Sequence, residues 1–138
     1  MVLGIGVNNL AVLVAAIASM IVGALWYGPL FGKTWMRLSG ISGQKLKQMK
    51  AKGMGKSYLM TFIASLVMAY VLSLIVTLAL ADTFVRGAVV GFWVWLGFVA
   101  TEDIRDVIWG GKSMGMFWLK GIGGLVTLAI MGAILAVW

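Results

Sequence analysis

The chain has no cysteine, no histidine and a single proline. Disulfides, thiolate nucleophiles, imidazole acid–base catalysis and metal sites built from thiolates or imidazoles are therefore excluded. Charged residues are also scarce. They make up 11% of the 138 residues, whereas about a quarter of an ordinary soluble domain is charged. A chain of this composition cannot cover itself with a polar surface.

Four continuous apolar runs fill most of the chain, and hydrophobic residues account for 62% of it. We expect helices over residues 9–27, 58–81, 84–101 and 116–138, because about 20 apolar residues cross a bilayer as a helix. A barrel is disfavoured because the runs do not alternate between apolar and polar residues. The first run has no preceding cation, so we expect a permanent helix rather than a cleaved signal peptide. The predicted fold is all-α, a four-helix transmembrane bundle forming one domain over residues 1–138.

Basic residues gather between the first two runs, where residues 31–56 carry seven of the eleven cations. Positive loops stay in the cytoplasm, so this loop is predicted to be cytoplasmic and both termini to lie outside. Membrane topology accounts for the net charge of +7, and no nucleic-acid partner is predicted. On the outer side, Arg86 follows Asp82 by four residues and is predicted to pair with it. Five lysines are predicted to contact anionic inner-leaflet headgroups: Lys45, Lys47, Lys50, Lys52 and Lys56.

The two halves of the chain share a loose pattern of a helix, a loop with Trp, Gly and Lys, and a returning helix. The segments "WYGPLFGKTWMRLSG" from Trp26 and "IWGGKSMGMFWLKG" from Ile108 carry it. Both halves have the same orientation, so the pattern favours a parallel 2+2 repeat, or else it is coincidental.

Small residues recur at four-residue spacing on the first and third helices. In lipid, helices associate through close backbone approach, which small residues permit. The spacing indicates either packing within one subunit or a face for self-association, and we expect a homo-oligomer. The predicted packing residues are Ala11, Ala15, Ser19, Gly23, Gly87 and Gly91.

A hydroxyl stripe on the second helix and two tryptophans near the centre of the third are the candidates for lining a pore or ligand site. The hydroxyls either bond to their own helix or line a polar path. The indole N–H groups need partners at that depth, and the hydroxyls on the second helix are candidates. The set consists of Thr61, Ser65, Ser73, Thr77, Trp93 and Trp95.

An acidic run holds three of the four carboxylates, Glu102, Asp103 and Asp106, with Arg105 between them. Clustered carboxylates bind Mg²⁺ or Ca²⁺, so these are weak metal candidates. The favoured interpretation is an interfacial charge network that pairs with the nearby lysine-rich loop. No ionisable residue is expected deep within the four apolar cores, which disfavours proton-coupled transport.

Residues 8–40, 91–98 and 131–138 resemble a family of bacterial and archaeal membrane proteins, domain of unknown function 1761 (DUF1761). The most specific element is "WYGPLFGKTW" from Trp26 to Trp35. The resemblance covers nearly the whole chain and implies four transmembrane helices in a prokaryotic cytoplasmic membrane. It implies no activity and no catalytic residues. The acidic run after residue 101 lies outside the family's pattern.

We therefore expect a multi-pass membrane protein without catalytic residues or cofactors. The leading hypothesis is a small homo-oligomeric bundle that binds or passively conducts a small solute without proton coupling. The alternative is an accessory or lipid-binding subunit of a larger membrane complex. An enzyme would have to place its chemistry at the acidic run.

Overall fold

In the computed structural model, which describes residues 4–40 and 42–138, the chain folds entirely into helical elements joined by short turns. Ile41, inside the predicted basic loop, lies outside these residues. The all-α fold class is confirmed. The elements in chain order are α1 (Asn9–Leu25), the π-helical segment η1 (Trp26–Leu30), α2 (Gly32–Ser39), α3 (Gly43–Ala51), α4 (Gly55–Leu78), α5 (Phe84–Val94), the π-helical segment η2 (Trp95–Ala100), α6 (Thr101–Ile108) and α7 (Met114–Val137).

Four spans are long and apolar enough to cross a membrane: Asn9–Leu30, Gly55–Leu78, Phe84–Ile108 and Met114–Val137. They contain 22, 24, 25 and 24 residues, which corresponds to about 33 to 38 Å at 1.5 Å per residue. The predicted four-span architecture is confirmed. The largest difference is in the third span, which continues seven residues beyond the predicted end at residue 101.

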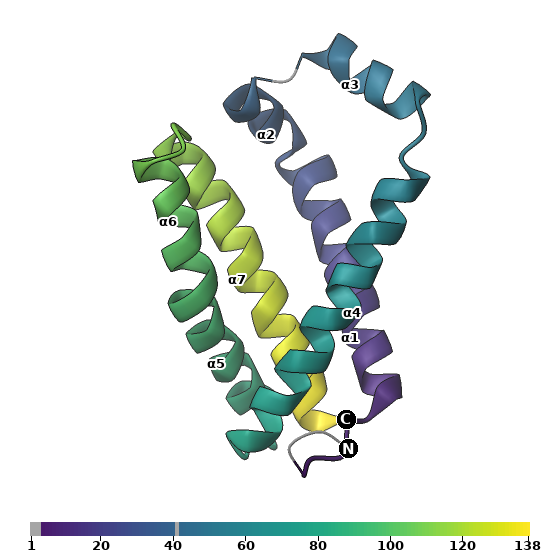
Figure 1. Cartoon of the computed structure of the whole chain (residues 1–138), viewed down its shortest axis with the longest axis vertical. Helices are drawn as coiled ribbons and strands as arrows, with labels where there is room; N and C mark the ends of the chain where they lie inside the picture. Colours follow the sequence, from purple (N-terminus) through teal and green to yellow (C-terminus); the bar gives the residue numbers. More distant parts are fainter. Residues whose placement is uncertain (1–3, 41) are drawn as a thin grey trace.

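The spans alternate in direction, so the beginning of α1 and the end of α7 lie at the same end of the bundle (Figure 1). We call this the terminal end; it also contains the turn at residues 79–83. The opposite, basic end carries α2, α3 and the turn at residues 109–113 (Figure 1). Which end faces the cytoplasm stays a prediction, as does the parallel repeat.

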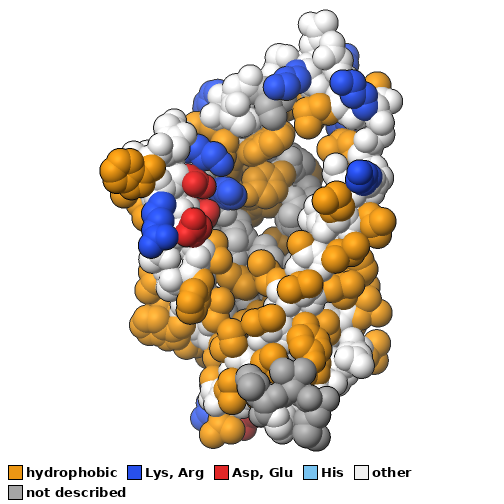
Figure 2. Space-filling view, viewed as in Figure 1, with side chains coloured by type: hydrophobic (Ala, Val, Ile, Leu, Met, Phe, Trp, Pro, Cys, Tyr) orange, Lys and Arg blue, Asp and Glu red, His pale blue; other side chains and the backbone are white. Residues whose placement is uncertain are grey.

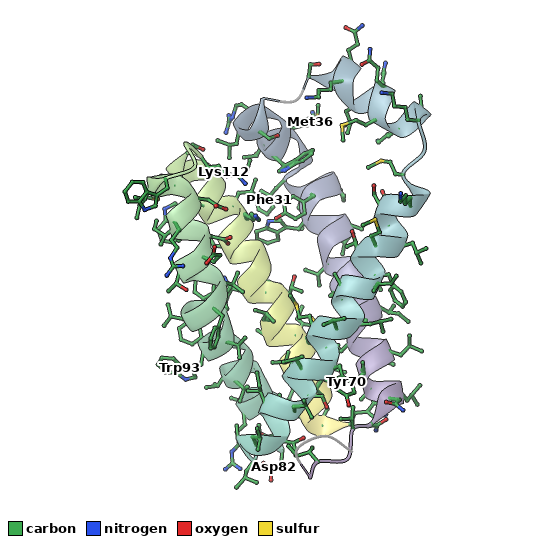
Figure 3. All side chains as sticks on the ribbon, viewed as in Figure 1. Phe31, Met36, Tyr70, Asp82, Trp93 and Lys112 are labelled. Atoms are coloured by element: carbon green, nitrogen blue, oxygen red, sulfur yellow. The ribbon has the colours of Figure 1, made fainter. Side chains whose placement is uncertain are left out.

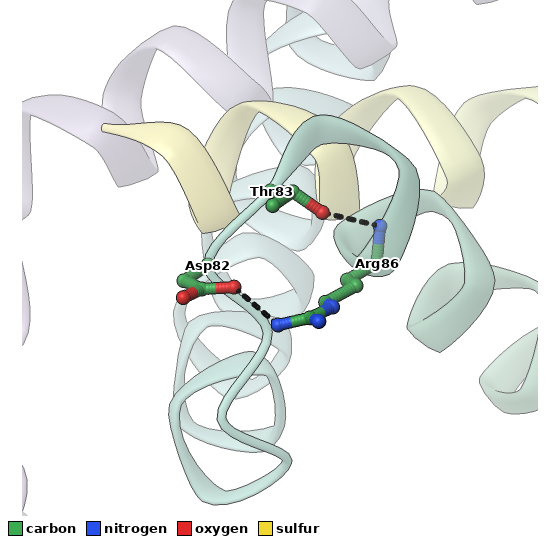
Figure 4. Close-up of polar contacts among 3 residues, drawn as sticks. All are labelled: Asp82, Thr83 and Arg86. Carbon is green, nitrogen blue, oxygen red and sulfur yellow. Dashed lines mark hydrogen bonds and ion pairs between the residues drawn. The ribbon is translucent and has the colours of Figure 1, made fainter.

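Side-chain caps fix where the helices begin. The Asn8 carboxamide oxygen accepts hydrogen bonds from the amides of Leu10 and Ala11, at 3.1 and 3.2 Å. Such caps satisfy donors that have no partner within the helix. At the terminal end, the Thr83 hydroxyl accepts from the Arg86 amide at 3.1 Å (Figure 4). The predicted ion pair of Arg86 with Asp82 is confirmed, with an N–O distance of 2.8 Å (Figure 4).

The half of the bundle near the terminal end is closely packed. A Cβ at Gly87 would overlap the Gly132 carbonyl oxygen, and one at Gly91 would overlap the Leu128 carbonyl oxygen. Helices α5 and α7 therefore touch backbone to backbone, which only glycine permits. Beside this crossing, α1, α4 and α7 share a buried core: Val12, Ala15, Ala16, Ala69, Leu72, Val76, Leu128 and Met131.

Toward the basic end the spans separate. Helix α7 is central, because it packs on α5 and α6 on one side and on α1, α2 and α4 on the other. Among the described residues, α4 packs on α1 and α7 and lightly on α5, but makes no comparable contact with η2 or α6. Figure 2 shows the resulting hollow, with hydrophobic side chains on its back wall.

Candidate binding cavity

The hollow contains an inner chamber of about 220 Å³. It lies where η1 and the end of the first span face α7 and the third span. Its walls are mainly apolar and aromatic, with an acidic and a basic side chain among them. The lining residues are Gly23, Trp26, Tyr27, Met68, Val99, Asp103, Lys120, Gly123, Gly124, Thr127 and Leu128.

A wider vestibule of about 690 Å³ opens next to the chamber at the basic end. Tyr27 and Lys120 line both spaces, so the two are adjacent. Phe31 and Lys112 lie on opposite sides of the opening (Figure 3). The vestibule is lined by Tyr27, Trp35, Leu38, Ser39, Gly111, Lys112, Ser113, Met116 and Lys120.

Trp26 fixes the wall that η1 contributes. Its indole Nε1 donates a hydrogen bond to the Leu119 carbonyl oxygen at 3.0 Å, and its ring lies 4.6 Å from that of Phe31. A Cβ at Gly123 would lie 2.7 Å from the indole nitrogen, so glycine is required there. Just beyond, Gly28 leaves helical geometry at φ −107° and ψ −106°. The chain therefore bends directly after Trp26, and α2, which follows, packs on α7, where a Cβ at Gly115 would lie 3.1 Å from Leu38.

Asp103 and Lys120 form an ion pair across the chamber wall, with an N–O distance of 3.9 Å. The Asp103 side chain is 13% exposed and that of Lys120 is 47% exposed. The second carboxylate oxygen of Asp103 is buried without a hydrogen-bond partner in the described structure. Asp103 lies inside the third span because the helix continues to Ile108. Asp103 lies five residues from the end of this span, so it is not deep within the apolar core, and the expectation that no ionisable residue lies at that depth stays a prediction.

The acidic run does not converge on a metal site. Each carboxylate faces its own cation: Glu102 lies 3.4 Å from Arg105 and Asp106 lies 3.9 Å from Lys112. Over residues 4–40 and 42–138, no three His, Cys, Asp or Glu side chains are placed to hold a metal ion. The acids are therefore ion-paired, but with Arg105, Lys112 and Lys120 and not, as predicted, with the lysine-rich loop. The metal candidates Glu102, Asp103 and Asp106 each face a different cation.

The hydroxyl stripe on α4 lines neither the chamber nor the vestibule. Thr61 and Thr77 donate to carbonyl oxygens one turn earlier in their own helix, at 2.8 and 2.9 Å. Ser65 is 3.9 Å from the Met20 sulfur, and Ser73 is buried in the closed half. Serine and threonine can satisfy themselves locally in a membrane helix, and a pore lined by these residues stays a prediction.

The two central tryptophans do not form a shared wall. Trp93 is 62% exposed and points away from the bundle (Figure 3). Trp95 packs against α7, where a Cβ at Gly121 or Gly124 would lie 3.7 or 3.5 Å from its ring. Its Nε1 is buried and has no partner in the described structure, so the predicted hydrogen bond to α4 hydroxyls is absent. The chamber's aromatic wall comes from Trp26 and Tyr27 instead.

The predicted packing residues lie at contacts within one chain, except that Gly23 lines the chamber. Ala11, Ala15 and Ser19 are buried on α1. Gly87 and Gly91 are buried against α7. The five loop lysines are exposed at the basic end, on or beside α3 and in the first turn of α4. Their contact with lipid headgroups stays a prediction.

Sequence reasoning missed Trp26, Tyr27, Lys120 and Thr127 as cavity residues. A usable indication was present for Lys120, which lies six residues inside an apolar span. A lysine at that depth needs water or an acidic partner, and Asp103 is the buried acid on the adjacent helix. Tryptophan at the end of a span is typical of the headgroup level, so Trp26 gave no such indication.

These features define a multi-pass helical membrane protein with a cavity that opens at one end. A family model described as "Protein of unknown function (DUF1761)" matches residues 10–136. The chain belongs to this family, which confirms the resemblance found in the sequence. No curated protein and no solved structure matches it.

Proposed function

We propose that the protein binds a small solute in the chamber, without chemical conversion, and receives it through the vestibule at the basic end. The observation that carries the proposal is an apolar chamber beside a wider vestibule, with Tyr27 and Lys120 lining both spaces. A concave, mainly apolar pocket with a few convergent polar groups is the usual form of a ligand site. Trp26 and Tyr27 supply apolar contact, and Asp103 and Lys120 supply polar contact.

Binding is favoured over conduction, because the half near the terminal end is closed by the α5–α7 crossing and by the core of α1, α4 and α7. No charged residue continues the Asp103–Lys120 pair through that half; residues 87–101 and 121–138 contain none. A proton relay would need such groups, so the proposal includes no proton coupling. In liposomes, we expect ion leakage at the level of empty vesicles, and leakage above that level would favour the conduction hypothesis.

The basic end is proposed to face the cytoplasm of a prokaryote, in keeping with the positive-inside rule. A homo-oligomer also stays a proposal. Ala11, Ala15, Gly87 and Gly91 do not support a homo-oligomer, because these residues pack within the chain. The role of an accessory subunit in a larger complex stays a prediction as well.

Native mass spectrometry of the full chain released from detergent tests the binding proposal, because it detects any bound mass whatever the solute is. We expect a bound small molecule on the wild-type chain and none on Thr127→Trp, whose indole fills the chamber. Val89→Trp is the matched control, because Val89 is 47% exposed on the outer face of α5. A wild-type chain without a bound mass, or a bound mass that survives in Thr127→Trp, contradicts the proposal.

A further inference from the structure

We propose that the solute is a phosphate-bearing lipid from the leaflet at the basic end, with its headgroup in the vestibule and one chain in the chamber. This inference rests on the proposed function and specifies its ligand. Two observations carry it: the charge lining the vestibule and the open side of the chamber.

The vestibule presents cations and hydroxyls to a ligand. Lys112 and Lys120 line it together with Ser39, Ser113 and Tyr27, and no carboxylate is among the described lining residues. Both lysines are about half exposed, and each lies 3.9 Å from its acidic partner. These long, exposed pairs leave ammonium protons available to another acceptor. The Ser39 hydroxyl already donates to the Trp35 carbonyl oxygen at 2.6 Å, which leaves Ser113 and Tyr27 as hydroxyl donors. A phosphate between the two lysines and these hydroxyls is the complementary group.

The chamber opens sideways as well as toward the vestibule. Met68 of α4 and Val99 of η2 both line it, although α4 makes no extensive contact with η2 or α6. Met68 is 43% exposed. The hollow between these elements faces outward in Figure 2. Since these elements belong to membrane spans, the opening faces lipid, and an acyl chain can enter without leaving hydrocarbon.

A lipid fits both spaces better than a soluble phosphate does. A soluble anion would use the vestibule and leave the apolar chamber without a suitable group. A lipid's chain gains little by moving from the bilayer to the chamber, because both are apolar. Selectivity must therefore come from the headgroup. At about 1 kcal/mol for each lysine, two lysines correspond to about a 30-fold preference for a phosphate-bearing lipid.

The test titrates the full chain in detergent micelles and follows binding by native mass spectrometry. The three probes are phosphatidylglycerol, diacylglycerol with the same chains, and glycerol 3-phosphate. We expect phosphatidylglycerol to bind about 30-fold more tightly than diacylglycerol, and glycerol 3-phosphate not to bind at the same concentrations. Equal binding of diacylglycerol removes the role of the phosphate and overturns the inference.

The remaining outcomes separate this inference from the proposed function. Binding of glycerol 3-phosphate as tight as that of the lipid overturns the lipid assignment and leaves solute binding intact. A bound mass that is not a lipid, and that Thr127→Trp removes, also overturns the lipid assignment and leaves solute binding intact. If the protein binds none of the probes and carries no bound mass, both this inference and the proposed function are overturned.

Charge variants test the headgroup position. We expect Lys112→Gln with Lys120→Gln to weaken phosphatidylglycerol binding about 30-fold, the contribution of two cations. The matched control, Lys47→Gln with Lys50→Gln, removes the same charge from exposed positions on α3 and should change binding less than threefold. Equal losses of phosphatidylglycerol binding in the two double variants would indicate non-specific electrostatic attraction and overturn the inference.

Substitutions in the chamber test the position of the lipid's acyl chain, and this test does not depend on the lysines. Val99→Trp should abolish phosphatidylglycerol binding while Val89→Trp retains it. A retained unfolding transition shows that each variant folds. If the double lysine variant does not fold, the comparison of Val99→Trp with Val89→Trp decides whether the inference holds. Retained lipid binding in Val99→Trp overturns the inference.

Discussion

Two glycines on α5 determine how closely the third and fourth spans approach. Gly87 and Gly91 lie against backbone atoms of α7, where a methyl group has no room. In a membrane, where lipid is as apolar as the side chains, close contact of this kind is a principal source of helix association. By contrast, Gly97 in η2 has no atom within 4 Å of the place its Cβ would occupy. The two kinds of glycine therefore respond differently to the same substitution.

Gly87→Ala should lower the free energy of unfolding by about 1–3 kcal/mol, because the added methyl group forces α5 away from α7. Gly97→Ala is the control and should be neutral or stabilising by up to about 1 kcal/mol, since alanine favours helix. Reversible unfolding in mixed detergent micelles measures both. Equal destabilisation by the two substitutions would contradict the backbone contact.

The two partners of the Asp103–Lys120 pair differ in exposure, so their removal should differ in cost. Lys120→Met leaves a buried carboxylate without its cation, and we expect a loss of about 1–3 kcal/mol. Asp103→Asn leaves a half-exposed lysine that extends into water, and should cost less. The double substitution should recover part of the Lys120→Met loss. The same micelle unfolding measurements form the double-mutant cycle, and a larger loss for Asp103→Asn would contradict the assigned burial.

At the scale of elements, the apolar runs were sufficient to predict the four spans, but the π-helical segments were not predictable. Apolar periodicity locates a helix and does not reveal a local change in hydrogen bonding from i−4 to i−5. The sequence therefore predicted an end at residue 101, whereas η2 leads into α6 and Asp103 faces α7. The chamber was not predictable for the same reason, because its walls come from all four spans, and the π-helical segments affect the rotation of the first and third.

Deleting Gly97 should rotate everything beyond η2 by about 100° around the helix axis. Cysteines at positions 103 and 120 should be cross-linked by a short bifunctional reagent in the full-length chain but not after the deletion. The chain has no native cysteine to interfere. Cysteines at 82 and 86, which precede η2, should be cross-linked in both chains. Cross-linking of 103 to 120 after the deletion would show that η2 does not set the direction of Asp103.

At the scale of the whole molecule, the chain divides into a closed half at the terminal end and an open half at the basic end. Helix α3 extends this asymmetry, because its residues are exposed apart from the half-buried Leu46. Length and composition predicted a membrane bundle, and charge predicted one strongly basic end. Length, composition and charge did not indicate which half of the bundle is open. That depends on where glycines contact backbone atoms and where they contact indole rings.

Single cysteines at Lys47 and Leu80 test the proposed orientation. Leu80 is 82% exposed at the terminal end, and Lys47 is exposed on α3. A membrane-impermeant thiol reagent should label Leu80→Cys in intact spheroplasts and Lys47→Cys only in inverted vesicles. The reverse pattern would invert the orientation of the chamber. Labelling of both from one side would contradict the number of spans.

The contact between the α5 and α7 backbones has a mechanical consequence. It holds two spans together near one membrane surface, while α4 diverges from the third span toward the other, so the molecule is broader at the basic end (Figure 1). A wedge of this shape occupies unequal areas in the two leaflets. Lateral pressure in the leaflet around the broad end therefore bears directly on the mouth of the chamber, whereas pressure in the opposite leaflet meets a rigid stem.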